Sequence, residues 1–183
     1  NEAISLLEKK RESNRSIRES YEEISLDLAR CYIAEAELRT KPESASDLQV
    51  AKYLIGAAGR KLSDPSLTIR KDYMFAMIAF MEGNVIKANE ILSRPGMSEL
   101  QDAEISTVTD AVRAWFNVGD TEKAKMFLKL SQEKLKNIED GNEKTVCSIL
   151  VTKGKDAIGD KRPQALEFNK VGLQKYSSKK YVV

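Results

Sequence analysis

The chain has 183 residues, of which 42% are hydrophobic and 32% are charged, and its formal net charge is +2. This balance is typical of an ordered, helix-rich soluble protein, whereas a disordered chain would carry fewer apolar residues and a larger charge imbalance. The longest apolar run, residues 73–81, is far shorter than the roughly 18–20 residues that a membrane-spanning helix needs. We therefore expect no contact with a membrane.

The first residues, Asn1-Glu2-Ala3, carry no basic patch followed by an apolar run, so no signal peptide is visible in them. Cys31 and Cys147 lie too far apart in the sequence to suggest a disulfide framework. We expect two buried thiols in a reducing compartment, which favours a cytoplasmic or nuclear location.

Apolar residues that recur every three or four positions predict helices along the first half of the chain. A short helix is predicted over residues 2–12 and a longer one over 15–38, which ends before Pro42. The short helix looks like the second half of a hairpin cut from a longer array. The run from Ser44 to Asp47 resembles a capping box that opens a helix reaching to Leu62.

The second half of the chain shows the same periodicity. Helices are predicted over 67–82, the most apolar element, and over 85–93. Ser98 and Gln101 resemble a second capping box, which opens the helix that leads to Trp115. Further helices are predicted over 145–158 and after Pro163, and no segment alternates as a strand would.

The clearest element is a pair of antiparallel helices over residues 106–135, joined at a tight turn over residues 117–120. Gly119 supplies the backbone freedom that a helix end needs, and the carboxylate of Asp120 can cap the next helix. Trp115 precedes the corner by about one turn, where its ring can fill the space between the two helices. The apolar stripes of both helices need neighbouring helices to cover them.

A weak internal repeat follows from the turns. Gly83 precedes Ala88 by five residues, as Gly119 precedes Ala124, and Gly159 precedes Ala165 by six. The alanines Ala51, Ala88, Ala124 and Ala165 are separated by 37, 36 and 41 residues. A helical-hairpin repeat of roughly this length is typical of tetratricopeptide arrays.

The segments AWFNVGDTEKAKMFL and FMEGNVIKANEIL resemble the tetratricopeptide repeat family. In the first, Trp115, Gly119-Asp120, Ala124 and Leu128 match the family's aromatic, turn, small and large apolar positions. In the second, Gly83-Asn84, Ala88 and Leu92 match the turn, small and large apolar positions. Ala79 occupies the position equivalent to Trp115, where the family has an aromatic residue. The resemblance covers residues 27–176 and is strongest over 72–135.

This resemblance implies an all-α, right-handed stack of antiparallel helical hairpins, a TPR-like α-solenoid, in a single domain. Its hairpins would span residues 15–62, 66–94, 98–137 and 144–176, after a half-hairpin over 1–12. Stacked helical hairpins of another superfamily and a closed helix bundle are the alternatives, because ordinary helix packing also uses small residues at crossings.

The sequence lacks histidine and the motifs that most often mark a catalytic or nucleotide-binding site. The chain contains no histidine, no Cys-x-x-Cys and no glycine-rich phosphate-binding motif. The absence of histidine excludes the commonest general base, the Ser-His and Cys-His nucleophile pairs and most zinc sites. The absence of a glycine-rich motif leaves no recognisable site for nucleotide phosphates. We expect no enzyme activity, no cofactor and no metal, and we interpret acidic pairs such as Glu22-Glu23 as solvated surface.

The resemblance instead implies a scaffold or adaptor that binds a protein or peptide in a concave groove. Two sets of side chains would line the groove: Arg70, Tyr73, Met77 and Phe80 of one repeat, and Thr109, Arg113, Phe116 and Asn117 of the next. Aromatic, Met and Arg side chains supply binding energy at interfaces. The alternative is that Tyr73, Met77, Phe80 and Phe116 belong to the core.

Two other functions stay open. From Lys153 onward the chain has eight basic residues against three acidic ones, so a nucleic-acid-binding module could use this end, including Lys161, Arg162 and Lys170. A solvated basic surface is the simpler interpretation of the same residues. The third candidate is a peptide-sensing domain of a regulator that uses the same groove.

Overall fold

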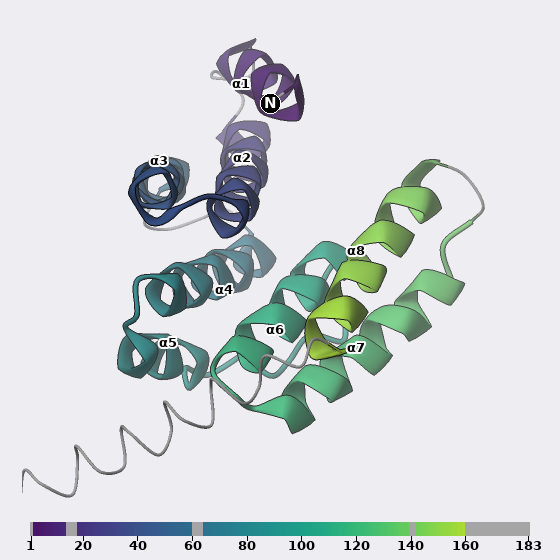
Figure 1. The fold of residues 1–183 in the computed structure, drawn as a ribbon. Helices are drawn as coiled ribbons and strands as arrows, with labels where there is room; N and C mark the ends of the chain where they lie inside the picture. The colour runs from purple at the N-terminus through teal and green to yellow at the C-terminus, as the bar shows by residue number, and fades with distance from the viewer. Residues whose placement is uncertain (1, 14–17, 60–63, 140–141, 160–183) are drawn as a thin grey trace, which may run out of the picture. The chain divides into compact units, whose positions relative to one another are not determined.

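The structure is a computed structural model that describes residues 2–13, 18–59, 64–139 and 142–159. These ranges contain eight helices and no strand (Figure 1), which confirms the predicted all-α class for the described part of the chain. None of these helices combines the length and apolar character that crossing a membrane requires. The helices are α1 (Glu2–Ser13), α2 (Arg18–Leu38), α3 (Lys41–Ala58), α4 (Pro65–Met81), α5 (Val85–Leu92), α6 (Ile105–Asn117), α7 (Thr121–Lys136) and α8 (Asn142–Gly159).

The chain divides into two compact units, which we describe separately. Unit 1 spans Asn1–Ala103 and unit 2 spans Glu104–Val183. In unit 1, α2 pairs with α3 and α4 pairs with α5, and α4 also packs against both α2 and α3. Helix α1 packs against α2. The first helices of the two hairpins, α2 and α4, therefore meet directly.

The core of unit 1 follows from the apolar stripes of its helices. Leu26, Ala29 and Ile33 of α2 are fully buried, as are Ala51 and Ile55 of α3. These positions are spaced by three and four residues, so each stripe faces its partner helix.

Unit 2 contains one hairpin and a third helix. Helix α6 pairs with α7, and α8 packs against both of them (Figure 1). Ile105, Cys147 and Val151 form a buried cluster, against which Leu128, Leu135 and Ile138 pack. Ten of the 13 residues of α6 are buried, so α6 is the central helix of this unit.

The corner between α4 and α5 is closed by a specific set of backbone hydrogen bonds. The amide of Asn84 donates to the carbonyl of Ala79 at 2.8 Å, and the amide of Gly83 donates to that of Phe80 at 2.9 Å. Gly83 has φ +81°, a left-handed conformation that glycine adopts without steric cost. This is a Schellman motif, which satisfies carbonyl groups at the end of a helix. The side chain of Asn84 then accepts from the amide of Lys87 at 3.0 Å and caps α5.

The corner between α6 and α7 has the same bonds 36 residues later. Asp120 donates to Trp115 at 2.9 Å, Gly119 donates to Phe116 at 2.9 Å, and Gly119 has φ +86°. The carboxylate of Asp120 accepts from the amide of Lys123 at 3.0 Å, as the sequence predicted. Ala88 and Ala124, which follow the two corners at the same distance, are both fully buried.

Two predicted helix starts are wrong. Helix α3 begins at Lys41, so Pro42 lies in its first turn, and the amide of Ser44 bonds to the carbonyl of Thr40 inside the helix. Proline is favourable there because backbone N–H groups in the first turn have no acceptor within the helix, so the N–H group that proline lacks costs no hydrogen bond. Helix α3 ends at Ala58, and Leu62, the predicted end, lies outside the described residues.

Helix α6 begins at Ile105 rather than near Ser98. Residues 93–104 instead form consecutive turns, which bury Met97 and Leu100. The spacing of Ser98 and Gln101 is compatible with a helix cap. The burial of Met97 and Leu100, however, decides the local structure. The helix expected after Pro163, with Ala165, lies outside the described residues.

Candidate partner-binding site

The eight residues predicted to line a groove come from the first helices of two hairpins, α4 in unit 1 and α6 in unit 2. Each set lies on one helix, and we describe each set within its own unit.

The α4 set is mostly internal. Arg70 is 2% exposed, Tyr73 and Met77 are fully buried, and only Phe80 is half-buried. The hydroxyl of Tyr73 donates to the backbone carbonyl of Met97, which ties the loop after α5 to α4. For Tyr73 and Met77, the alternative of a core position is what the structure shows.

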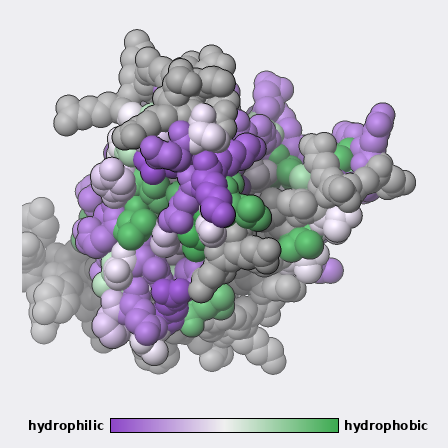
Figure 2. Space-filling model, turned by 90° about the horizontal axis from the view of Figure 1, so that it is seen from above, coloured by the Kyte–Doolittle hydropathy of each residue, from purple (hydrophilic) through white to green (hydrophobic). Residues whose placement is uncertain are grey.

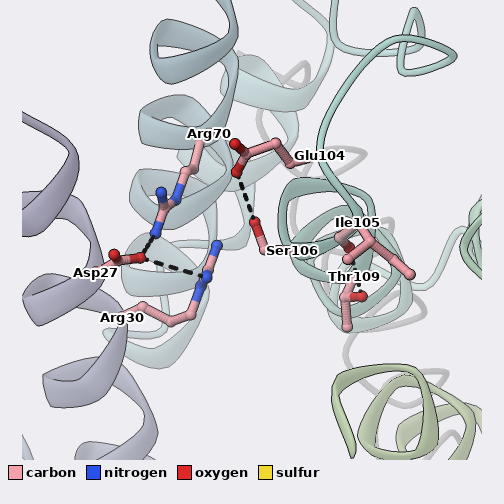
Figure 3. A network of polar contacts seen from close by, with 7 residues as sticks. All are labelled: Asp27, Arg30, Arg70, Glu104, Ile105, Ser106 and Thr109. Carbon is pink, nitrogen blue, oxygen red and sulfur yellow. Dashed lines mark hydrogen bonds and ion pairs between the residues drawn. The ribbon is translucent and has the colours of Figure 1, made fainter. Parts of the chain in front are cut away.

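The α6 set divides in the same way. Thr109 is buried and its hydroxyl donates to the carbonyl of Ile105 at 2.8 Å, one turn earlier in the helix (Figure 3). Phe116 is buried, whereas Arg113 and Asn117 are half-buried. Phe80, Arg113 and Asn117 are therefore the predicted site residues whose side chains reach solvent.

A charged cluster that the sequence did not reveal lies between α2 and α4 of unit 1. We call Asp27, Arg30 and Arg70 the Asp27 cluster. The guanidinium of Arg70 donates from Nη2 to Oδ1 of Asp27, and Nη1 of Arg30 lies 3.9 Å from the same oxygen. Figure 3 shows both guanidinium groups directed at this one carboxylate.

Exposure differs strongly across the Asp27 cluster. The side chain of Arg70 is 2% exposed and that of Arg30 is 17% exposed, but that of Asp27 is 37% exposed. The carboxylate thus lies at the solvent edge and Arg70 lies behind it. The Nε atom of Arg70 is buried and has no hydrogen-bond partner among the described residues.

Only the pairing of Asp27 with Arg30 could have been inferred from the sequence. Asp27 and Arg30 stand three residues apart, a spacing at which side chains on one helix face interact. Arg70 is 43 residues from Asp27, and no local pattern links the two. A buried arginine needs a partner, and for Arg70 that partner lies within the chain.

Other cations of unit 1 are paired at its surface. Arg94 lies 3.0 Å from Asp72, and Lys52 pairs with Glu82. Arg39 lies 3.2 Å from Glu35 and 3.3 Å from Asp47. Each of these basic side chains has an acidic counterpart close by.

In unit 2, the corner after α6 holds a cation on an aromatic ring. Nζ of Lys123 lies 3.8 Å from the ring centroid of Trp115 and 3.7 Å from Oδ2 of Asp120. Trp115 is buried, as expected for a ring that fills the space beside the corner. Stacking of an ammonium on an aromatic face is favourable, so Lys123 covers the ring and adds to the stability of the corner.

The titratable groups with shifted pKa values have structural causes. Burial raises the pKa of the Cys31 thiol, and the nearby charge of Asp27 raises it further. Burial and the neighbouring Glu8 carboxylate raise the pKa of Tyr32. Hydrogen bonds from Ser66 lower the pKa of Asp64. In the part of the chain that the structure describes, no group of three or more metal-binding side chains is found.

The face shown in Figure 2 has hydrophobic and hydrophilic side chains interspersed, and no single large apolar area stands out among its coloured residues. The most exposed large apolar side chains come from different helices, among them Leu38, Tyr53 and Ile86. Scattered apolar residues of this kind are normal on a protein surface.

No protein-family model, curated protein or solved structure matches this chain.

Proposed function

We propose that this chain is a protein-binding helical module, a scaffold or adaptor that holds a segment of a partner against the first helices of its hairpins. The observation that supports this most is the recurrence of one corner, bond for bond, after 36 residues. Repeats that share one corner present similar helix faces, and surfaces built from such repeats commonly bind other proteins.

Rigid corners also suit this role energetically. The Schellman bonds and the capping side chains of Asn84 and Asp120 hold each hairpin in one geometry before any partner arrives. The protein then loses little conformational freedom on binding, which lowers the cost of association. Phe80, Arg113 and Asn117 are the residues of the predicted groove that remain accessible for contact.

Selection from a phage-displayed library of random peptides against the full chain tests this proposal. We expect enrichment of peptides that share a sequence pattern. A synthetic peptide of that pattern should bind about tenfold more weakly to Arg113→Ala or Phe80→Ser, a loss of roughly 1.4 kcal/mol. Fluorescence anisotropy measures the affinity, and circular dichroism checks that each variant keeps its helix content.

Met126→Ser is the matched control, because Met126 is 50% exposed on α7, the second helix of its hairpin. This change should leave peptide affinity unaltered. Failure to enrich any pattern, or equal affinity of all variants, would remove the proposed binding function.

A further inference from the structure

We infer that helix α1 is a displaceable cover on α2. It undocks as a unit while the rest of unit 1 stays folded, and it thereby controls access to the face of α2 that carries Tyr21, Ser25 and Tyr32. This face lies outside the predicted groove, so the inference goes beyond the proposed function.

Hydrogen bonds and a cation–π contact tie α1 to α2. Nε of Arg11 donates to the Ser25 hydroxyl at 3.0 Å, and Nη2 of the same guanidinium donates to the Tyr21 hydroxyl. The guanidinium carbon also lies 4.7 Å from the ring centroid of Tyr21. About one turn earlier in α1, Glu8 accepts a hydrogen bond from the Tyr32 hydroxyl at 3.2 Å. Water can replace contacts of this kind, so their net contribution to docking is modest.

The apolar side chains of α1 are poorly buried. None of residues 4–13 is buried, Ile4 and Leu7 are half-buried, and Leu6 is 61% exposed. Helices α2 to α5 each bury several apolar residues instead. Because packing of an apolar face supplies most of the stability of a helix within a protein, docking stabilises α1 less than packing stabilises the other helices of unit 1.

The two sides of α2 differ in what departure of a neighbour would expose. Leu26, Ala29 and Ile33 form the fully buried stripe that packs on α3, and exposing them to water would be costly. On the side of α1, Tyr21 and Tyr32 are half-buried, and their hydroxyls can bond to water when α1 leaves. Helix α2 keeps its contacts with α3 and α4 in that state, so α1 can open by itself.

Amide hydrogen exchange of the full chain, followed by NMR spectroscopy, tests this inference. Relative to unstructured peptides, the amides of α1 should be protected at least about tenfold less than those of residues 24–33 in α2, since a weakly held helix opens without global unfolding. Arg11→Gln removes a docking contact and should accelerate exchange throughout α1 about tenfold. Exchange in α3 and α4 should change less than twofold. Equal protection of α1 and of residues 24–33 in the unaltered chain would overturn the inference whatever the variant shows.

Lys9→Gln is the matched control, because Lys9 is exposed on the same helix and the variant makes the same change in net charge. It should alter exchange in α1 less than twofold. Equal acceleration by Arg11→Gln and Lys9→Gln would show an effect of charge or helix propensity alone and would overturn the inference. Equal acceleration of α1, α3 and α4 in Arg11→Gln would overturn it too, because α1 would then open only together with the whole unit.

Nitration by tetranitromethane distinguishes undocking of the whole helix from the loss of one contact. Tyr32 contacts α1 through Glu8, so undocking caused by Arg11→Gln should accelerate nitration of Tyr32 about tenfold. Tyr53, which is 70% exposed on α3, is the internal reference and should react at the same rate in both proteins. Faster nitration of Tyr21 with an unchanged rate at Tyr32 would show that only the local contact is lost, and α1 would not be a displaceable cover.

Discussion

Arg70 is the residue whose environment departs most from that of an ordinary surface arginine. Its side chain lies almost wholly within unit 1, and its charge is balanced by an aspartate on another helix. Burial of a charged group is tolerated only when a partner compensates for lost hydration. The Asp27 cluster therefore joins the two hairpins of unit 1 and also supplies its most unusual electrostatic feature.

Glycine at the corners has a testable conformational role. Gly83 has φ +81° and a Cβ atom added there would meet nothing within 4 Å, so backbone conformation alone opposes a side chain. We expect Gly83→Ala to lower the free energy of unfolding by about 1–2 kcal/mol. Urea unfolding followed by circular dichroism measures the change.

Gly56→Ala is the control with the opposite sign. Gly56 lies inside α3, and a Cβ atom added there also has free space. Alanine is the better helix residue, so this variant should gain roughly 0.5–1 kcal/mol. Destabilisation of similar size by both variants would contradict the assigned role of the left-handed corner.

At the scale of the element, the start of α4 depends on Asp64. Its carboxylate accepts from the amide of Ser66 at 2.7 Å and from the Ser66 hydroxyl at 2.6 Å. An aspartate at this position also interacts favourably with the positive end of the helix dipole. The hydrogen bonds from the Ser66 hydroxyl and the Ser66 amide lower the pKa of Asp64 from its usual 3.8.

Asp64→Ala should therefore destabilise the protein by about 0.5–1 kcal/mol at pH 7, because an exposed cap is partly screened by solvent. A carboxyl pKa that is lower in the folded state adds stability above the unfolded pKa, and this stability is lost as the pH falls through the folded pKa. The difference between wild type and variant should thus shrink as the pH falls below 3.8. Urea unfolding at several pH values measures it.

Asp64→Asn distinguishes the charge from the hydrogen bond. Asparagine keeps an oxygen acceptor but does not titrate, so its stability relative to Asp64→Ala should not depend on acid pH. A difference between wild type and Asp64→Ala that stays constant from pH 7 to strongly acidic pH would exclude the carboxylate as the source of stability.

At the scale of the whole molecule, the chain forms two compact units, and the single tryptophan of the chain, Trp115, lies in unit 2. Chains with more than one compact unit often depart from a single unfolding transition. Tryptophan fluorescence should report unit 2, whereas circular dichroism reports both units.

Ala88 and Ala124 occupy equivalent buried positions after the two corners. Leucine at either position should overpack the helix crossing and cost roughly 1–3 kcal/mol. Ala124→Leu should shift the fluorescence transition in urea, and Ala88→Leu should shift only part of the circular dichroism change. Ala45→Leu, at an exposed position of α3, is the control. A fluorescence transition that moves equally for Ala88→Leu and Ala124→Leu would show that the units unfold together.

Local patterns predicted most of the helices and both corners correctly. Gly119, Asp120 and Ala124 act through hydrogen bonds and packing within a few residues, so their roles could be inferred from spacing alone. The start of α6 could not, because the turns over residues 93–104 form where Met97 and Leu100 find apolar surroundings. The helical-repeat resemblance stays a prediction, supported by the equivalence of the two corners.

The sequence alone determined that the described chain is helical and where its hairpins turn, since helix periodicity, capping and glycine conformation are properties of neighbouring residues. Only the tertiary structure decided which side chains of α4 and α6 are core and which reach solvent. It also decided that Arg70 meets Asp27, because two residues 43 positions apart are brought together by packing of α2 against α4. Burial and long-range charge pairing depend on the neighbours that folding supplies, which no stretch of sequence contains by itself.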